Sequence, residues 1–489
     1  MKVPLSEQLL FEKAASGSGQ FSAEHSLLNR EKLVSRVPSF FLRKNEIGLP
    51  ELSERDLVMH YTRLAGRMFS VDSHFYPLGS CTMKYNPKIS EDVSSEEGFQ
   101  YAHPFQNEDD VQGCLQMMHE LEQRLNVICG MDAFTLQPSA GAHGELTALL
   151  IARKYFKDRK EERIKVVVPD SSHGTNPASA SLCGFHVVTI PSLNGEVDMA
   201  ALERECTSDL AVFMLTNPNT AGLFEKNIVS ICEKVHSAGG LTYYDGANLN
   251  ALMGIARPGD MGFDLLHVNL HKTMATPHGG GGPGSGPVGV KAHLVSYLPV
   301  PFVEKKKDDV YKWSYKRPGT IGMMKSFWGN FGVALKAAVY CDALGFSGLK
   351  QASLTAVLNA NYLKKKLEDT FTVPFNELCM HEFVMTPHPE KSPAKTLDMA
   401  KRLLDFGIHA PTVYFPLTVK ESMMIEPTET ESKDTLDEFV SVMMQIADEA
   451  RNQPEKLHDA PLTTYRQRLD EVRAARNPVL KYGDPVDPA

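Results

Sequence analysis

Four polar side chains that could take part in chemistry each follow a short apolar stretch of the chain. They are His173, Thr216, Asp245 and Lys272. Lys272 lies in the segment 268–290, which is so rich in glycine and proline that neither a helix nor a strand can continue through it. A lysine amine held at such a break can form a Schiff base with an aldehyde, provided that neighbouring groups bind that aldehyde.

Pyridoxal phosphate is the aldehyde cofactor whose requirements these residues meet. It needs an amine, a carboxylate that keeps its pyridine nitrogen protonated, a pocket for phosphate and a flat partner for its ring. Lys272, Asp245 and His173 would supply the amine, the carboxylate and the flat partner, respectively. We therefore predict a Schiff base on Lys272 and an electron-accepting ring that Asp245 keeps protonated. These three residues are the predicted catalytic groups.

The phosphate pocket is predicted at a turn of small residues, Ser139, Ala140 and Gly141, just before the helix-like segment 146–156. A turn that opens a helix exposes unpaired backbone N–H groups at the positive end of the helix dipole, which suits an anion. By itself, the same pattern also fits a plain helix start.

Two further residues are predicted to contact the cofactor. Thr216 could hydrogen-bond the ring hydroxyl, and Ala247 is small enough to let the ring lie against the backbone. Each polar residue taken alone also fits a simple structural role, as an exposed loop histidine, a type I turn, a helix N-cap or a solvated lysine. Their joint occurrence after successive apolar runs favours a cofactor site.

An alternation of strand-like and helix-like segments predicts the fold that positions these residues. The strand-like runs are 164–168, 186–190, 210–215, 241–244 and 264–270, and helix-like segments between them include 199–205 and 229–238. This alternation is typical of an α/β fold with a mainly parallel sheet covered on both faces, whose ligands bind beyond the carboxyl ends of the strands. The separation of Asp245 and Lys272 leaves room for one crossover, which needs about a dozen residues or more, so both can flank one cofactor.

Three parts are expected along the chain. Residues 1–70 would form an N-terminal arm, 71–330 the cofactor-binding large domain, and 331–489 a smaller α+β C-terminal domain and tail. The elements predicted beyond the large domain are helices at 327–344, 354–367, 396–406 and 435–451 and strands at 382–386 and 423–425. The loop 74–87 fits either a connection or a functional loop, and 426–431 is interpreted as the approach to a helix.

Composition excludes several classes of function. A chain of 489 residues with a formal charge of -9 shows no basic footprint for nucleic acid. Its 8 cysteines show no CxxC pairing, which indicates neither a zinc site nor a disulfide framework. No signal-peptide core and no apolar run of bilayer length is expected, so we predict a cytoplasmic protein without a membrane partner.

Two other interpretations of the glycine-rich segment are weaker. A P-loop would require a lysine directly after the glycines, and the next one is Lys291. His271 and His278 have no carboxylate or cysteine at ligand spacing, so no metal site is predicted.

Four motifs closely resemble the glycine cleavage system P-protein family of pyridoxal-phosphate glycine decarboxylases. They are PLGSCTMK at 77–84, LQPSAGAHGE at 136–145, NLHK at 269–272 with PHGGGGPG at 277–284, and APTVYFP at 410–416. The resemblance runs from about residue 70 to 480, and the length is similar to that of the lysine-bearing subunit 2 of the two-subunit form. The family often has Asn-Ser in place of Ser139-Ala140 and Gln in place of His143, which leaves the exact phosphate contacts open.

The resemblance implies a fold-type-I enzyme that decarboxylates glycine. The remaining aminomethyl group would pass to the lipoyl disulfide of H-protein, which makes the enzyme formally an oxidoreductase of glycine catabolism. His173 would stack on the ring, Asp245 would hold the pyridine nitrogen, and His271 would lie near the phosphate. The glycines at 279–282 would let the backbone pass close to the cofactor and admit the lipoyl arm.

The resemblance also implies a partner. A lysine-less subunit 1 of similar fold would complete an α2β2 heterotetramer and part of the glycine pocket. The alternatives are a free-standing amino-acid decarboxylase or aminotransferase, and a non-catalytic structural subunit. No arginine for a second substrate carboxylate is assignable, and Lys272 argues against a structural subunit.

Overall fold

The computed structural model describes residues 7–15, 35–45, 48–278, 284–387 and 392–483. The chain forms two compact units, Met1–Phe69 with Pro461–Ala489, and Ser70–Ala460. The described helices of the first unit are α1 (Leu10–Ala15), η1 (Ser39–Phe41), α3 (Glu54–Ala65) and α16 (Glu471–Arg476). The tail thus groups with the N-terminal segment, and the predicted division of the larger unit at residue 330 stays a prediction.

The larger unit is built on a seven-stranded sheet with the order β1-β9-β8-β7-β6-β2-β3. Its strands are β1 (Ala133–Thr135), β2 (Lys165–Pro169), β3 (His186–Ile190), β6 (Leu210–Thr216), β7 (Leu241–Gly246), β8 (Leu265–Val268) and β9 (Val288–Val290). The five strands from β3 to β8 run parallel, which confirms the predicted sheet. Two short strands were not predicted: β9 pairs antiparallel with β8, and β1 antiparallel with β9.

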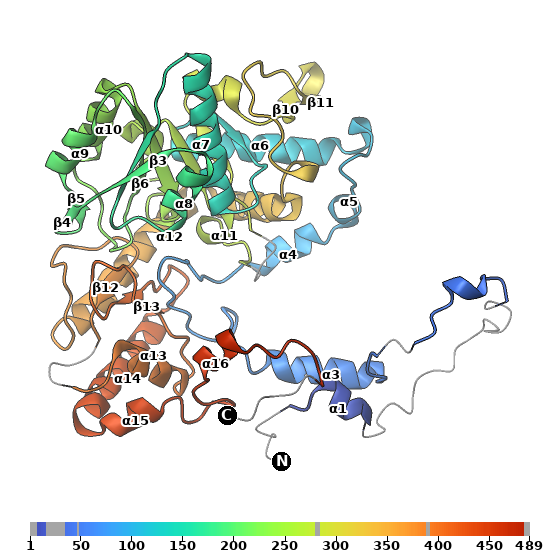
Figure 1. The fold of residues 1–489 in the computed structure, drawn as a ribbon, viewed down its shortest axis with the longest axis vertical. Helices are drawn as coiled ribbons and strands as arrows, with labels where there is room; N and C mark the ends of the chain where they lie inside the picture. The colour runs from blue at the N-terminus through green and yellow to red at the C-terminus, as the bar shows by residue number, and fades with distance from the viewer. Residues whose placement is uncertain (1–6, 16–34, 46–47, 279–283, 388–391, 484–489) are drawn as a thin grey trace. The chain divides into compact units, whose positions relative to one another are not determined.

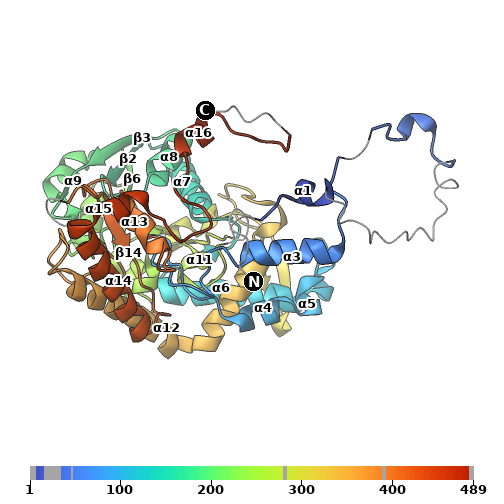
Figure 2. The same ribbon diagram turned by 90° about the horizontal axis from the view of Figure 1, so that it is seen from below.

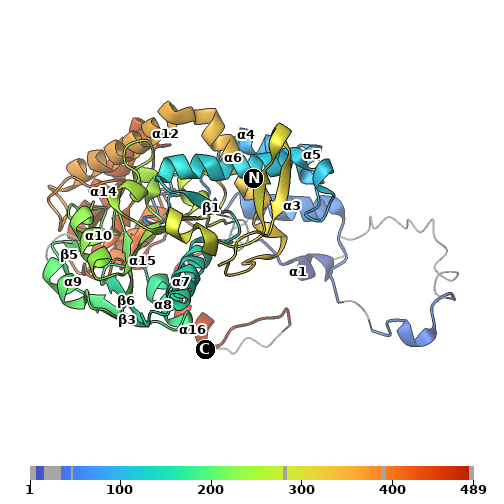
Figure 3. The same cartoon turned by 90° about the horizontal axis from the view of Figure 1, so that it is seen from above.

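Helices cover both faces of this sheet (Figures 1 and 3). Within β2, Val166 and Val168 pack on one side and Val167 on the other, because successive strand residues point to opposite faces. The helices on the first side are α7 (Gly141–Asp158) and α8 (Thr175–Leu182). The helices on the second side are α6 (Gln112–Cys129), α9 (Met199–Glu205), α10 (Ile228–Ser237) and the first half of α12 (Phe331–Leu367).

The long helix α12 joins two hydrophobic cores. Its first half packs in the core of the sheet and its second half in the C-terminal core, where α14 (Lys433–Asn452) also lies (Figure 2). Two helices were predicted here, and Gly345, with φ 60° and ψ −175°, marks the break between them. The segment Ser326–Leu367 is long and apolar enough to span a membrane, a test that we expected no segment to pass. It passes because its apolar residues serve two cores.

The C-terminal part of the larger unit has the predicted mixture of helices and strands. Its strands are β12 (Phe383–Met385), β14 (Met423–Ile425) and β13 (Thr412–Val413), in that antiparallel order. Its remaining helices are α13 (Thr396–Leu404) and α15 (Pro454–Asp459). The loop before α4 (Lys88–Ser94) reaches this sheet, since Leu78 forms a bridge with Ile425.

Short elements complete the connections within the larger unit. They are α5 (Glu97–Gln100), η2 (Glu108–Asp110), β4 (Ser192–Leu193), β5 (Glu196–Val197), η3 (Leu249–Ala251), η4 (Pro258–Met261), α11 (Leu270–Thr273), η5 (Ala292–Tyr297), β10 (Phe302–Lys305), η6 (Lys307–Asp309), β11 (Tyr311–Ser314) and η7 (Ser326–Trp328). The one-turn helix α11 carries Lys272 directly after β8.

Candidate active site

A cavity of about 240 Å³ lies at the carboxyl ends of the parallel strands. The predicted site residues that line it are Ala140, Gly141, His173, Thr216, Asp245, Ala247, His271 and Lys272. Ser139 does not line it; its backbone N–H donates to His143 Nδ1 at 3.1 Å instead. The strand order brings these side chains together because parallel strands end at the same edge of a sheet.

The amine and the carboxylate stand on neighbouring strands. β7 pairs with β8 so that Asp245 is opposite His267, and Lys272 follows β8 in α11. The Lys272 amine donates to the Ser80 carbonyl at 2.8 Å. Asp245 is 2% exposed and accepts the Ala247 N–H at 3.0 Å. Both groups are therefore held in place at one cavity.

Asp245 is fixed by further contacts that the sequence did not predict. The Asn176 side chain donates to it at 3.3 Å, and His267 Nε2 lies 3.5 Å away. The other ring nitrogen of His267 contacts the Tyr243 hydroxyl. Burial lowers the pKa of His267, so the ring is held neutral between Asp245 and Tyr243. The carboxylate is thus held in a defined orientation.

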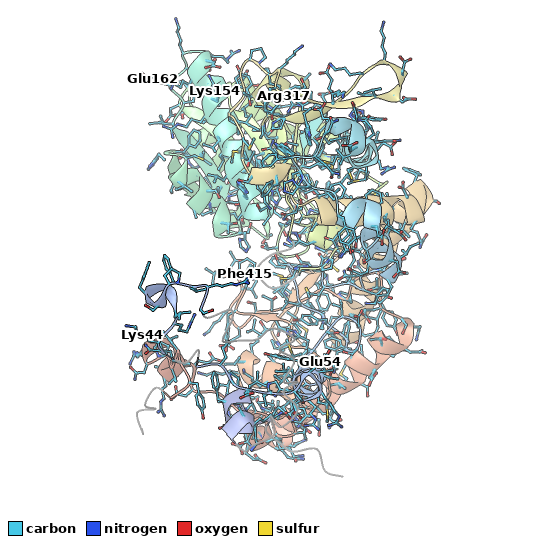
Figure 4. The ribbon with its side chains drawn as sticks, turned by 90° about the vertical axis from the view of Figure 1, so that its right-hand side faces the viewer. Lys44, Glu54, Lys154, Glu162, Arg317 and Phe415 are labelled. Carbon is cyan, nitrogen blue, oxygen red and sulfur yellow. The ribbon has the colours of Figure 1, made fainter. Side chains whose placement is uncertain are left out.

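His173 is exposed on its outer side and borders the cavity on its inner side. Its Nδ1 lies 3.0 Å from the Thr175 hydroxyl, which donates to Glu145 at 2.8 Å. The ring of Phe415, labelled in Figure 4, approaches the His173 ring edge-on with a centroid distance of 6.1 Å.

Glu145 also lines the cavity. Burial is the main cause, and the nearby Asp245 the second, that raises the pKa of Glu145 to about 8. Glu145 is thus protonated at neutral pH.

The predicted phosphate turn opens α7, an 18-residue helix that begins at Gly141. A Cβ atom at Gly141 would collide with the Asn269 side chain, and one at Gly286 with the Ala140 carbonyl. Such close packing lets the backbone N–H groups at the start of α7 border the cavity, where the helix dipole favours an anion.

His271 lies beside this turn. Burial, His278 and Lys272 lower the pKa of His271 to about 3, so its ring stays neutral. The Ser285 N–H donates to its Nδ1 at 3.4 Å. The neighbouring glycines at 279–282, which we predicted to pass close to the cofactor, lie outside the described residues.

The cavity contains a buried polar atom that suits a ligand. Among the described residues, the Thr216 hydroxyl is buried and makes no hydrogen bond. Buried polar groups are usually hydrogen-bonded, so a ligand group is a natural partner for it. With an amine, a carboxylate and a helix N-terminus at the same cavity, these donors and acceptors fit pyridoxal phosphate.

The sequence left the loop 74–87 undecided, and the structure places part of it at the site. Ser80 lines the cavity, and the buried Lys84 donates to the Thr273 carbonyl at 2.9 Å and to Glu429 at 2.7 Å. The signals for this role in the sequence were a proline- and glycine-containing loop between periodic segments and the motif at 77–84 that resembles the P-protein family. The described residues that line the cavity include no arginine.

Comparison with known protein families shows to which family the chain belongs. Residues 27–317 match the glycine cleavage system P-protein, and residues 352–464 match the glycine dehydrogenase C-terminal domain. The chain belongs to the glycine cleavage system P-protein family. A probable glycine dehydrogenase (decarboxylating) subunit 2 from Staphylococcus haemolyticus is 55% identical over 99% of this chain and 98% of its own length. One from Caldanaerobacter subterraneus is 55% identical over 97% and 98%, respectively.

Solved structures support the fold. The crystal structure of an inhibitor-bound glycine decarboxylase (P-protein) has a TM-score of 0.72 at 21% identity and covers 91% of this chain and 100% of its own. A sphingosine-1-phosphate lyase from Burkholderia pseudomallei has a TM-score of 0.63 at 14% identity and covers 85% and 95%. The chain therefore has the fold of the fold-type-I pyridoxal-phosphate enzymes, as predicted. Family membership assigns it to glycine decarboxylation in the glycine cleavage system.

Proposed function

We propose that Lys272 carries pyridoxal phosphate as a Schiff base. The chain would use this cofactor to decarboxylate glycine and to transfer the remaining aminomethyl group to H-protein. The observation that carries this proposal is that the Lys272 amine and the buried Asp245 carboxylate line one cavity. When bound, the cofactor would accept the electron pair released as the bond between the glycine α-carbon and its carboxylate breaks.

The residues of the chain would hold the cofactor from several sides. Asp245 would keep the proton on the ring nitrogen, because hydrogen bonds from Ala247 and Asn176 hold its carboxyl group in position. Thr216 would bind the ring hydroxyl, and the N–H groups at the start of α7 would bind the phosphate. His173 would cover the ring, and its contact with Thr175 sets the orientation of the imidazole.

Transfer of the aminomethyl group, in place of its protonation to methylamine, requires an acceptor with a reducible bond. Carbon dioxide leaves, and the aminomethyl carbon would bond to one sulfur of the lipoyl disulfide of H-protein. The disulfide is reduced in this step, since its second sulfur leaves as a thiolate and takes up a proton. The exposed outer side of His173 indicates that the cavity opens to solvent there, which would let a lipoyl arm enter.

A partner chain would complete the glycine pocket. The similar proteins are named subunit 2, and the described lining residues offer no arginine for the glycine carboxylate. We therefore propose a lysine-less subunit 1 in an α2β2 heterotetramer, acting in the cytoplasm. An aminotransferase would normally use an arginine for a second substrate carboxylate, and the described lining residues offer none for that role either.

The first prediction tests the Schiff base directly. Lys272→Ala should abolish the visible absorbance band of the purified chain with its cofactor, because no amine remains at the end of β8. Borohydride reduction followed by peptide mapping should label Lys272 in the wild type. Lys291→Ala is the matched control, since Lys291 donates to the Gly130 carbonyl and does not line the cavity.

The activity assay is exchange of labelled bicarbonate into glycine with H-protein and subunit 1 present. The wild type and Lys291→Ala should exchange the label, and Lys272→Ala should not. A reduced cofactor attached to another lysine would refute the assignment of Lys272. A normal band without any exchange would point to another amino-acid decarboxylation.

A further inference from the structure

A turn at residues 80–82, with backbone strain, contacts the proposed reactive lysine, Lys272. Ser80 has φ 64° and Thr82 has φ 49°, although neither is glycine. Residues with side chains rarely adopt this left-handed region, so the surrounding structure must hold them there. The carbonyl of Ser80 accepts the hydrogen bond from the Lys272 amine. The geometry of the turn therefore bears on the position of that amine.

Two buried carboxyl groups hold this turn by its backbone. The Ser80 N–H donates to Glu382 Oε2 at 2.7 Å, and the Thr82 N–H donates to Glu426 Oε2 at 3.0 Å. Both glutamates are 0% exposed. They come from distant parts of the chain, 302 and 344 residues from their partners. The backbone N–H groups of Ser80 and Thr82, the two residues of the turn with positive φ, thus each donate to a carboxyl oxygen.

The C-terminal sheet sets the two carboxyl groups side by side. β12 pairs with β14 so that Phe383 is opposite Ile425, and Glu382 and Glu426 are the next residues outward from this pair. The remaining oxygens accept from side chains that follow β7, Asn248 at 3.5 Å and Asn250 at 3.3 Å. The pair therefore joins the C-terminal sheet, the segment after Asp245 and the strained turn.

The pair does not carry two full negative charges. Burial, and then the neighbouring Glu426, raise the pKa of Glu382 well above its usual range. Burial raises the pKa of Glu426 to about 7, although its bonds to Thr82 and the nearby Lys272 act in the opposite direction. Burial thus favours the protonated form of both carboxyl groups, and the turn receives hydrogen-bond acceptors from the pair.

We propose that Glu382 and Glu426 are positioning residues: they hold the left-handed turn by its N–H groups and, through the Ser80 carbonyl, fix the place of the Lys272 amine. The inference rests on the proposed function, because that function requires the Lys272 amine to occupy a defined position. It also gives the C-terminal sheet a role at a cavity formed by the other half of the unit.

Metal binding is the main alternative for these side chains. Ligand atoms of His381, Glu382 and Glu426 lie within 4.8 Å of one another, and neither ring nitrogen of His381 makes a hydrogen bond among the described residues. One oxygen of each carboxyl group, however, is already taken by the turn. We therefore assign the pair to the turn and treat metal as an outcome of the test.

The test compares alanine and glutamine at both positions. Glu382→Ala and Glu426→Ala remove the acceptor, whereas Glu382→Gln and Glu426→Gln keep an acceptor oxygen. In the cofactor-free protein, acetylation of Lys272 measured by peptide mass should be faster in the alanine variants by about 5- to 30-fold, because a hydrogen bond to the turn is lost. Glutamine should keep the rate within about twofold of the wild type.

A matched control and a rescue separate positioning from general loss of packing. Glu122→Ala removes another buried carboxyl group, which lies in α6 and interacts electrostatically with Arg317, and it should leave the acetylation rate unchanged. Thr82→Gly placed in Glu426→Ala should restore a slow rate, because glycine adopts the left-handed region without strain. In the holoenzyme, the pH midpoint of the visible band should shift in the alanine variants only.

Each outcome supports or refutes the inference. Equal acetylation rates in wild type and alanine variants would refute it, and so would glutamine variants as fast as alanine. Stoichiometric metal in the purified protein would assign the three side chains to an ion instead. If the alanine variants do not fold, Glu382→Asp and Glu426→Asp, whose shorter side chains withdraw the acceptor oxygen from the turn, should show the faster acetylation, and rates equal to the wild type would refute the inference. Absence of a borohydride label on wild-type Lys272 would remove the proposed function, whereas the cofactor-free rates would still test the turn.

Discussion

At the scale of single residues, Glu145 controls how much negative charge the cavity holds. Its pKa is raised to about 8 by burial and by Asp245, so it is neutral at pH 7 and becomes charged above pH 8. A second carboxylate in the cavity should oppose binding of an anionic cofactor. We predict that pyridoxal phosphate binds the wild type roughly tenfold more weakly at pH 9 than at pH 7.

Glu145→Gln keeps the size of the side chain and cannot ionise. Its cofactor affinity should therefore change little over the same range of pH, as measured by titration of the visible band. Glu162, an exposed residue labelled in Figure 4, supplies the matched control Glu162→Gln, which should behave as the wild type. A variant with the full wild-type pH dependence would show that another group is responsible.

At the scale of elements, the N-terminus of α7 depends on glycine. Gly141→Ala would push a methyl group into Asn269 beside the proposed phosphate position. We predict at least about tenfold weaker cofactor binding, measured by the same titration, because the contacts of a charged phosphate with N–H groups are displaced. Equal affinity of wild type and variant would remove the α7 turn from the phosphate site.

Gly113 in α6 supplies the control for the effect of alanine on a helix. A Cβ atom at Gly113 meets nothing within 4 Å. Gly113→Ala should leave cofactor binding unchanged and raise the free energy of unfolding by about 0.5–1 kcal/mol, because alanine favours the helix more than glycine does. Gly141→Ala combines a helix-favouring change with a collision, so its binding defect cannot come from poor helix formation.

The elements also show which features a sequence can predict. The runs that became β2, β6, β7 and β8 are buried on both faces, so each is a mainly apolar stretch that is followed by polar residues. The positions of Asp245 and Lys272 follow from that pattern alone. The strands β1 and β9 have three residues each, too few to show a period. The start of α12 was predicted too early because Phe327 and Trp328 have positive φ.

At the scale of the whole molecule, the residues that sequence reasoning missed are those held by distant contacts. Ser80 reaches Lys272 across 192 residues, and Glu382 reaches Ser80 across 302. No local spacing encodes such contacts, because they depend on how the C-terminal sheet packs against the rest of the larger unit. The segment 426–431 was interpreted only as the approach to a helix, and its first residue, Glu426, supports the turn beside the cavity.

Buried carboxyl groups also set how the stability of the whole molecule depends on pH. Burial raises the pKa of Glu122 to about 8, against a usual value of 4.5, although Arg317 acts in the opposite direction. Between pH 4.5 and about 8 the folded chain therefore keeps a proton that the unfolded chain has lost. The free energy of unfolding should fall as pH rises through this window, by up to about 5 kcal/mol from this group alone.

Glu122→Gln should remove that contribution. The decrease in the thermal unfolding midpoint between pH 5 and pH 8 should be smaller in this variant than in the wild type. Some decrease should remain, because Glu145 and Glu426 are also buried with raised pKa values and act in the same direction. Glu120→Gln on the same helix is the matched control, since Glu120 is partly exposed beside Arg124. A pH dependence identical in Glu122→Gln and the wild type would mean that Glu122 is ionised in the folded chain, with Arg317 compensating its charge.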